Sequence, residues 1–183
     1  MTNRSNMTII NRQARIILFT LLTVIPLADI AAGADPIRDI EHRLRQLEDK
    51  EAIRFLLIEY GRTLDARDFK SFSELFAKDD GVWDGGMGVA KGRAAIRKLM
   101  EDTIGKNTGA VKSPNFHLFD NEVITVDGDT ATAFCKWSFV VQGEDRRPQW
   151  VYLGHYNDTF IREDGHWKFL LRKVTSAIPG EQQ

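Results

Sequence analysis

The sequence predicts an α+β domain in which helices come first and an antiparallel sheet follows. Up to Gly105, apolar residues recur at the three- and four-residue spacing of an amphipathic helix. Beyond Gly105 they alternate with polar residues, as in strands that bury one face. The alternating segments are separated by short turns rich in Gly and Asp, which is typical of hairpins. Helices followed by hairpin-linked strands favour a sheet covered by helices on one face.

The first 34 residues have the pattern of a secretory signal. Arginines and no acidic residue precede an apolar run of about 13 residues that begins at Ile16, and Ala32-Gly33-Ala34 fits the A-x-A cleavage pattern. The run is shorter than the roughly 20 apolar residues of a membrane-spanning helix. We therefore expect a signal over 1–34, one domain over 35–183, and export to the periplasm or the medium. An uncleaved N-terminal anchor is the alternative.

The composition narrows the classes of partner. The chain has 183 residues and a net charge of −1, which gives no reason to expect nucleic acid or, after signal cleavage, a membrane surface. Cys135 is the single cysteine, so an intramolecular disulfide and a cysteine metal cluster are excluded. The four histidines lack the spacing of a helical metal site, and the glycines match no phosphate or dinucleotide loop. We expect a small-molecule partner, with no metal and no cofactor.

Several helices are expected in the first half of the mature chain. Asp35-Pro36 predicts a helix start, because Asp caps helices and Pro suits the first helical position. The apolar phase slips near residue 48, which predicts a second helix from Asp49. Asp68 predicts the N-cap of a short helix, and Gly92 precedes another.

The second half predicts strands joined by tight turns. A short strand over 82–84 and a turn at Gly85-Gly86 come first. Asp127-Gly128-Asp129 and Glu163-Asp164-Gly165 predict tight hairpins, and a charged loop over 143–147 joins the middle pair. The long strands are expected at 115–126, 130–142, 149–162 and 166–175.

A set of motifs in a fixed order resembles a known family. The motifs are LEDKEAI at 47–53, YGRTLDARD at 60–68, LFAKDD at 75–80, KGRAAI at 91–96, NFHL at 115–118, GHYND at 154–158 and DGHWKF at 164–169. In order and spacing they resemble the SnoaL-like group of the nuclear-transport-factor-2-like superfamily, over nearly all of the mature chain. The resemblance implies a cone-shaped fold, in which a curved antiparallel sheet wraps around the N-terminal helices and a pocket opens between them. It also implies a homo-oligomer, a dimer or trimer, formed through the sheet.

The resemblance implies that Asp65 and His117 form a buried dyad, as in the scytalone and bile-acid dehydratases of this superfamily. A neutral imidazole can take a proton from carbon when a carboxylate holds its other nitrogen. Tyr60 matches a tyrosine of the bile-acid dehydratase, and its phenol would polarise a carbonyl or protonate a leaving hydroxyl. Structural roles stay open: His117 as a strand histidine satisfied by a carboxylate, and Tyr60 as a core residue.

Strand alternation and the resemblance together predict the pocket wall. The expected substrate-binding residues are Trp83, Asp84, Phe119, Asn121, Trp137, Tyr152 and Tyr156. Such an aromatic wall suits a flat or ring-shaped apolar molecule. Ordinary core packing is the alternative for several of these residues, and a turn position is the alternative for Asp84.

Three functions follow from these residues, because the superfamily hosts enzymes and non-enzymes on one fold. The first is a cofactor-independent lyase of the dehydratase type, in which His117 removes a proton, Asp65 orients it and Tyr60 assists. The second is a non-catalytic domain for small-molecule binding or dimerisation. The third is a ketosteroid-isomerase-like isomerase or polyketide cyclase, in which Asp84 is the base and Tyr60 the oxyanion donor.

Overall fold

The structure is a computed structural model that describes residues 28–105 and 114–179. Residues 1–27, which hold most of the predicted signal, lie outside the described residues. The chain divides into two compact units, residues 1–38 and 39–183. In the first unit the described residues, 28–38, are helical. The second unit contains the sheet, the remaining helices and every candidate site residue.

Helix α1 (Ala28–Asp65) is continuous, where the sequence predicted two helices. The predicted start at Asp35 is wrong, because Pro36 lies inside the helix. The alanines that precede Pro36 are strong helix formers and favour an earlier start. The phase slip near residue 48 marks a change of environment: Leu44 and Leu47 are exposed, whereas burial begins at Ile53. Among the described residues, no helix is both long and apolar enough to cross a membrane.

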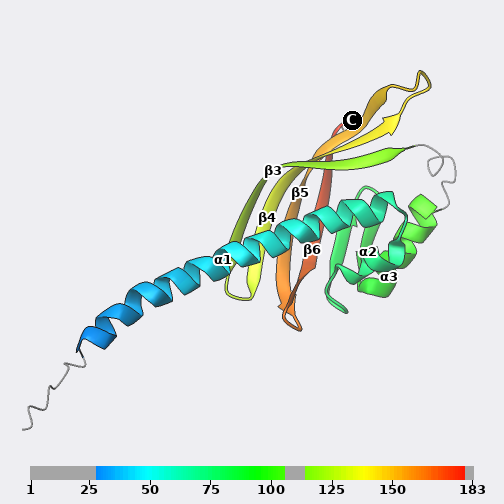
Figure 1. Ribbon diagram of the computed structural model, residues 1–183. Helices are drawn as coiled ribbons and strands as arrows, with labels where there is room; N and C mark the ends of the chain where they lie inside the picture. The colour runs from blue at the N-terminus through cyan, green and yellow to red at the C-terminus, as the bar shows by residue number, and fades with distance from the viewer. Residues whose placement is uncertain (1–27, 106–113, 180–183) are drawn as a thin grey trace, which may run out of the picture. The chain divides into compact units, whose positions relative to one another are not determined.

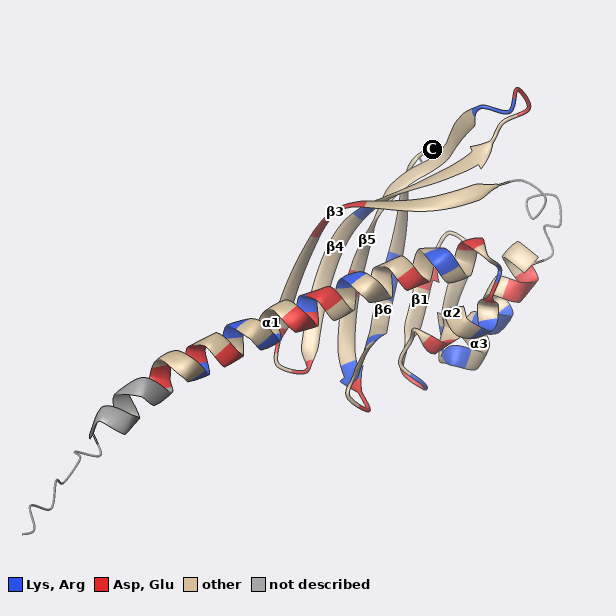
Figure 2. Ribbon diagram, viewed as in Figure 1, with Lys and Arg blue, Asp and Glu red and all other residues tan. Residues whose placement is uncertain are grey.

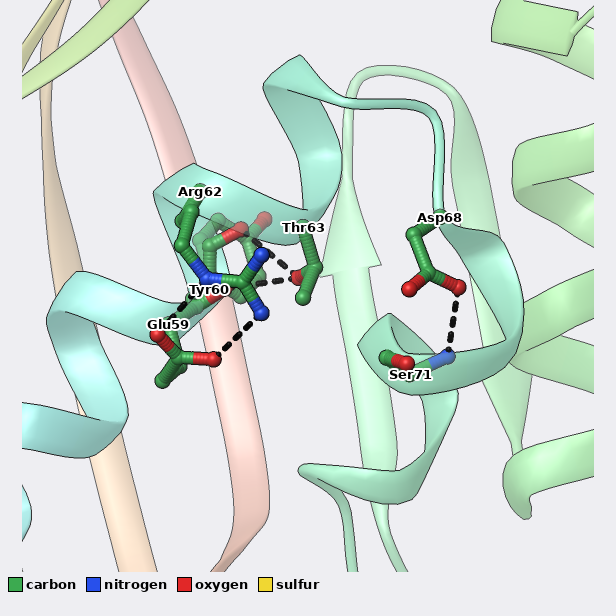
Figure 3. Close-up of polar contacts among 6 residues, drawn as sticks. All are labelled: Glu59, Tyr60, Arg62, Thr63, Asp68 and Ser71. Atoms are coloured by element: carbon green, nitrogen blue, oxygen red, sulfur yellow. Dashed lines mark hydrogen bonds and ion pairs between the residues drawn. The ribbon is translucent and has the colours of Figure 1, made fainter.

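The shorter helices are α2 (Phe69–Glu74) and α3 (Arg93–Met100), and α3 continues into the π-helical turn η1 (Glu101–Gly105). Asp68 caps α2 as predicted, since its carboxylate accepts a hydrogen bond from the Ser71 backbone N–H at 3.1 Å (Figure 3). Gly92 precedes α3 with φ of 79°, a conformation that glycine adopts without steric cost.

The strands form one six-stranded sheet in the order β2-β1-β6-β5-β4-β3 (Figure 1). They are β1 (Val82–Gly85), β2 (Gly88–Lys91), β3 (Asn115–Asp127), β4 (Thr130–Gln142), β5 (Pro148–Glu163) and β6 (His166–Ile178). Neighbours are antiparallel except β1 and β6, which are parallel. The sheet is curved and unclosed, and the helices of the second unit pack against it, so the predicted α+β fold with helices packed in a curved sheet is confirmed. The short strand β2 was not predicted.

The core lies between the helices and one face of the sheet. Ile53 of α1, Phe72 of α2 and Ile96 of α3 are fully buried, and so is Phe169 of β6. Charged residues follow α1, the ends of the hairpins and also the long strands (Figure 2), where most of them, such as Lys136 of β4, are exposed. The fold therefore encloses an apolar interior, and the charged side chains found inside it require an explanation.

Candidate functional site

Asp65 and His117 are in direct contact. Asp65 is the last residue of α1, and His117 lies near the start of β3. One carboxylate oxygen, Oδ1, lies 2.6 Å from His117 Nδ1, and the other, Oδ2, accepts the His117 backbone N–H at 2.9 Å. Two contacts from one carboxylate fix both the strand and the ring. The hydrogen bond to Nδ1 leaves Nε2 as the unpaired nitrogen of an imidazole whose side chain is 12% exposed.

Gly61 allows α1 to approach β3 closely enough for this contact. A Cβ atom at position 61 would lie 2.6 Å from Cε2 of Phe119 and 3.5 Å from Cβ of His117. Real Cβ atoms do not tolerate the first of these distances, so the helix or the Phe119 ring has to move.

We expect Gly61→Ala to destabilise the domain, even though alanine favours a helix over glycine by about 1 kcal/mol. Overpacking against Phe119 costs about 1–3 kcal/mol and separates Asp65 from His117. Urea unfolding of the variant measures the loss. A Gly61→Ala, Phe119→Leu double variant restores space and should recover part of the stability. Equal midpoints for the wild type and Gly61→Ala would contradict this reading.

A cavity of about 550 Å³ lies beside the His117 ring. Aromatic rings make up much of its wall: Tyr60, Trp83, Trp137, Phe139, Tyr152 and Tyr156. The remaining lining residues are Leu64, Arg67, Gly86, Met87, Thr103, Ile104, His117, Val174 and Ser176. The His117 ring is 4.7 Å from the Phe139 ring, and the Trp137 and Tyr156 rings stack at 5.5 Å. The cavity is therefore suited to a planar, largely apolar molecule.

Tyr60 lines the same cavity. The Trp83 indole N–H donates a hydrogen bond to Tyr60 Oη at 3.0 Å, so the hydroxyl proton of Tyr60 is free to point elsewhere. Burial raises the pKa of Tyr60, and the nearby Arg172 guanidinium opposes this only in part. The phenol therefore stays protonated and acts as a hydrogen-bond donor. The end of α1 at Asp65 allows Tyr60, one and a half turns earlier, to line the cavity beside His117.

A buried ion pair supports this wall from behind. Arg172 of β6 donates two hydrogen bonds to Asp158 of β5, at 2.9 and 2.8 Å, and both side chains are fully buried. The guanidinium carbon lies 3.9 Å from the ring centroids of both Tyr60 and Tyr156. Burial alone lowers the pKa of Arg172, but the Asp158 carboxylate raises it above its ordinary value, so the guanidinium is charged. The pair fixes two rings of the cavity.

The structure brings most of the predicted site residues together. Tyr60 and His117 line the cavity, Asp65 holds His117 from behind, and the predicted wall residues Trp83, Trp137, Tyr152 and Tyr156 line it as well.

Three predicted wall residues do not line the cavity. Phe119 faces inward but packs in the core, with its ring 5.8 Å from that of Tyr156. Asn121 lies at an irregularity between Asp120 and Val123 that interrupts the strand alternation, has φ of 56° and is exposed. Asp84 follows the inward-facing Trp83 on β1, so alternation turns it to the opposite face.

Some residues of the site were not predicted. Asp158 is an acid on the same inward strand face as Tyr156, which is the signal that could have revealed a buried pair. Arg67 lines the cavity from the second position after α1, where glycine is usual at a helix end, and the absence of glycine there was visible in the sequence. Thr103 and Ile104 come from η1 and gave no pattern. Within the described residues, no group of His, Cys, Asp and Glu side chains could hold a metal ion.

Comparison with known proteins assigns this architecture to a family. The SnoaL-like domain matches residues 45–173, which hold the dyad, most of the cavity wall, strands β1 to β5 and the first part of β6. The chain belongs to the SnoaL-like domain family.

Other proteins are similar to this chain along most of their length. An NTF2-like protein with a cystatin-like fold from Novosphingobium aromaticivorans is 30% identical with a TM-score of 0.70, over 79% of this chain and 92% of that one. A protein of the same organism whose name places it with scytalone dehydratase is 25% identical with a TM-score of 0.59, over 72% of this chain and 85% of the other. The uncharacterized protein Rv2910c of Mycobacterium tuberculosis is 28% identical over 141 residues, 73% of this chain and 88% of its own.

Proposed function

We propose that this SnoaL-like domain is a cofactor-independent lyase of the dehydratase type, acting on a small, ring-containing, oxygenated molecule. One observation carries the proposal: the His117 ring is fixed by Asp65 at 2.6 Å and at the same time lines a cavity of about 550 Å³. A histidine that served only the strand would not need to line an open cavity.

The dyad suits proton removal from a carbon next to a carbonyl. With Asp65 ionised, Nδ1 carries the proton and donates to the carboxylate, so the Nε2 lone pair is available as the base. When Nε2 takes the substrate proton, the carboxylate stabilises the imidazolium that forms. A positioned base of this kind contributes roughly 10²–10⁴ in rate.

Tyr60 supplies the complementary donor. Its raised pKa keeps the phenol protonated, and Trp83 already occupies one acceptor site of its oxygen. The phenol is thus free to donate to the carbonyl oxygen of a substrate, where negative charge develops as the proton leaves. In a β-hydroxy ketone, the electrons of the broken C–H bond then form the new double bond. The hydroxyl leaves as water with the proton that His117 had taken up, which returns the imidazole to its neutral form.

The other two functions receive less support. A ketosteroid-isomerase-like mechanism requires Asp84 in the pocket, and Asp84 does not line it. A purely structural association domain has no need of a cavity, whereas this cavity falls within the roughly 300–1,000 Å³ of ligand sites. Small-molecule binding without turnover therefore remains the competitor that an experiment has to exclude.

Dehydration of 3-hydroxy-1-tetralone provides that experiment, because loss of water gives fluorescent 1-naphthol. We expect the wild type to accelerate the reaction without added metal or nucleotide, and Asp65→Asn to slow it, since an amide no longer stabilises the imidazolium. If the ketone binds but naphthol forms at the uncatalysed rate, the chain is a binding protein and the lyase proposal fails.

We further propose that the domain assembles through the outer face of the sheet. Phe116, Leu118, Phe134 and Ile178 are 55%, 42%, 37% and 59% exposed, and strand alternation and register place them on the face opposite His117. Burial of this face against a second copy would remove the exposed apolar area from water. Sedimentation of Leu118→Glu should then give monomers where the wild type gives dimers or trimers. A wild-type monomer at micromolar concentration would contradict the proposal.

Export of the chain remains a proposal that rests on the sequence of residues 1–34. Cleavage after Ala34 would leave a helix that begins with Asp35 and Pro36, residues suited to a helix N-terminus. N-terminal sequencing of the protein recovered from the periplasm or the medium tests this. A chain that retains Met1 or Met7 at its N-terminus would refute cleavage.

A further inference from the structure

Arg67 occupies a backbone position at which arginine is less stable than glycine. It follows α1 with φ of 59°, in the left-handed region. The Arg67 N–H bonds to the Leu64 carbonyl at 3.1 Å, and the Asp68 N–H bonds to the Thr63 carbonyl at 2.9 Å. This pair of bonds is the Schellman arrangement, in which the residue at position 67 is usually glycine. A side chain there strains the backbone, so its presence calls for a role.

The Arg67 side chain lies in the cavity wall. Its Nη1 donates to the Leu64 carbonyl at 2.8 Å, which anchors one end of the guanidinium. Its Nε is buried and has no hydrogen-bond partner in the described structure. The Leu64 carbonyl already accepts the Arg67 backbone N–H, so capping of α1 does not explain why the side chain turns inward. A buried donor without an acceptor is costly, so the side chain gains free energy if a small rotation brings its guanidinium to a ligand oxygen in the cavity.

The charge of the lining points to the kind of acceptor. Among the described lining residues, Arg67 is the one that carries a permanent charge. Burial lowers the pKa of its guanidinium, and the Asp65 carboxylate opposes this, so the group is partly desolvated. A positive charge in an otherwise aromatic wall attracts an anion. The planar guanidinium favours carboxylate oxygens in particular.

We infer that Arg67 is a specificity-determining residue that binds a carboxylate of the ligand, so that the pocket takes planar aromatic or ring-containing carboxylic acids. The inference rests on the proposed function in that it concerns the ligand of the same cavity. The ligand would then be held at two points. Its ring lies against the aromatic wall beside His117, and its carboxylate binds the Arg67 guanidinium.

A matched pair of probes tests this without any need for turnover. 2-Naphthoate and 2-naphthamide share ring and size but differ in charge. Isothermal titration should show the wild type binding naphthoate roughly 10- to 100-fold more tightly than naphthamide, as expected for hydrogen bonds to a charged group. Arg67→Gln should remove that preference and leave naphthamide binding unchanged. Arg67→Lys should restore it in part, because an ammonium retains the charge but lacks the planar donor geometry.

Arg62 provides the matched control. It lies five residues earlier, on α1, and its guanidinium donates hydrogen bonds of 2.7 Å to the Glu59 carboxylate (Figure 3). Arg62 does not line the cavity. Arg62→Gln should keep the full preference for naphthoate. Equal affinities for the two probes, a preference that survives Arg67→Gln, or no binding of either probe at millimolar concentration would overturn the inference.

The outcome is separable from that of the proposed lyase. His117→Ala should keep the preference for naphthoate while losing any turnover. If the tetralone assay fails but naphthoate still depends on Arg67, the pocket is a carboxylate-binding site without lyase activity. If turnover is present and the naphthoate preference is absent, the lyase proposal is supported and carboxylate binding by Arg67 is refuted.

Discussion

Replacement of His117 by alanine is expected to lower the rate of 3-hydroxy-1-tetralone dehydration by roughly 10²–10⁴-fold, the contribution of a positioned general base. The residual cavity still binds the ketone, so the loss should appear in kcat more than in KM. The His117 backbone N–H still bonds to Asp65 in this variant, and the strand keeps its place. The change in unfolding free energy should therefore stay near 1 kcal/mol, the value of one hydrogen bond.

His166 is the matched histidine for this measurement. It lies exposed at the start of β6, and no cavity residue depends on it. His166→Ala should retain wild-type kcat, which excludes a general effect of imidazole removal. Full activity in His117→Ala with an intact fold would reject the dyad as the base and leave the Asp65 contact as a structural feature.

The architecture of the sheet could be predicted because apolar and polar residues alternate along each long strand. Alternation over 130–142, for example, marks Cys135 and Trp137 as inward residues, and both are buried. The hairpin at Asp164-Gly165 could be predicted equally well, because Asp and Gly tolerate the positive φ of tight hairpin turns. Both residues adopt positive φ in the structure. Local patterns of this kind survive folding because neighbouring strands reinforce the same face.

The helices show where local pattern is insufficient. The phase slip before Asp49 was interpreted as a break, yet α1 continues through it. A change in apolar phase reports which face meets a partner, and that can change along one unbroken helix. At Asn121 the sequence pattern is regular but the strand is not. A bulge in β3 shifts the alternation of its side chains, and no residue type in this segment predicts the bulge.

Contact between Asp65 and His117 was the most informative prediction for the site. The two residues are 52 positions apart, so no local rule relates them, and the resemblance to a family supplied the link. Arg67 and Asp158 had no such guide. Each breaks a local rule, arginine at a glycine position and an acid on a buried strand face, and such violations concentrate at functional or structurally demanding positions.

Removal of the Asp158 carboxylate is expected to have the largest effect on stability. Asp158→Ala leaves Arg172 fully buried and charged without its counter-ion, and the loss of one partner of a buried pair costs about 3–5 kcal/mol. That is a large share of the roughly 5–15 kcal/mol that stabilises a domain. Urea unfolding should show a much lower midpoint at an unchanged slope.

A paired replacement distinguishes charge burial from loss of packing. Asp158→Ala combined with Arg172→Met removes both charges and keeps an unbranched apolar side chain between the Tyr60 and Tyr156 rings, so it should recover much of the lost stability. Glu59→Ala is the surface control, because its pair with Arg62 is exposed and contributes less than about 1 kcal/mol. If Asp158→Ala costs no more than Glu59→Ala, the buried pair is not a structural support of the cavity. If the double variant is stable but binds naphthoate poorly, the guanidinium is needed to hold the two rings in place.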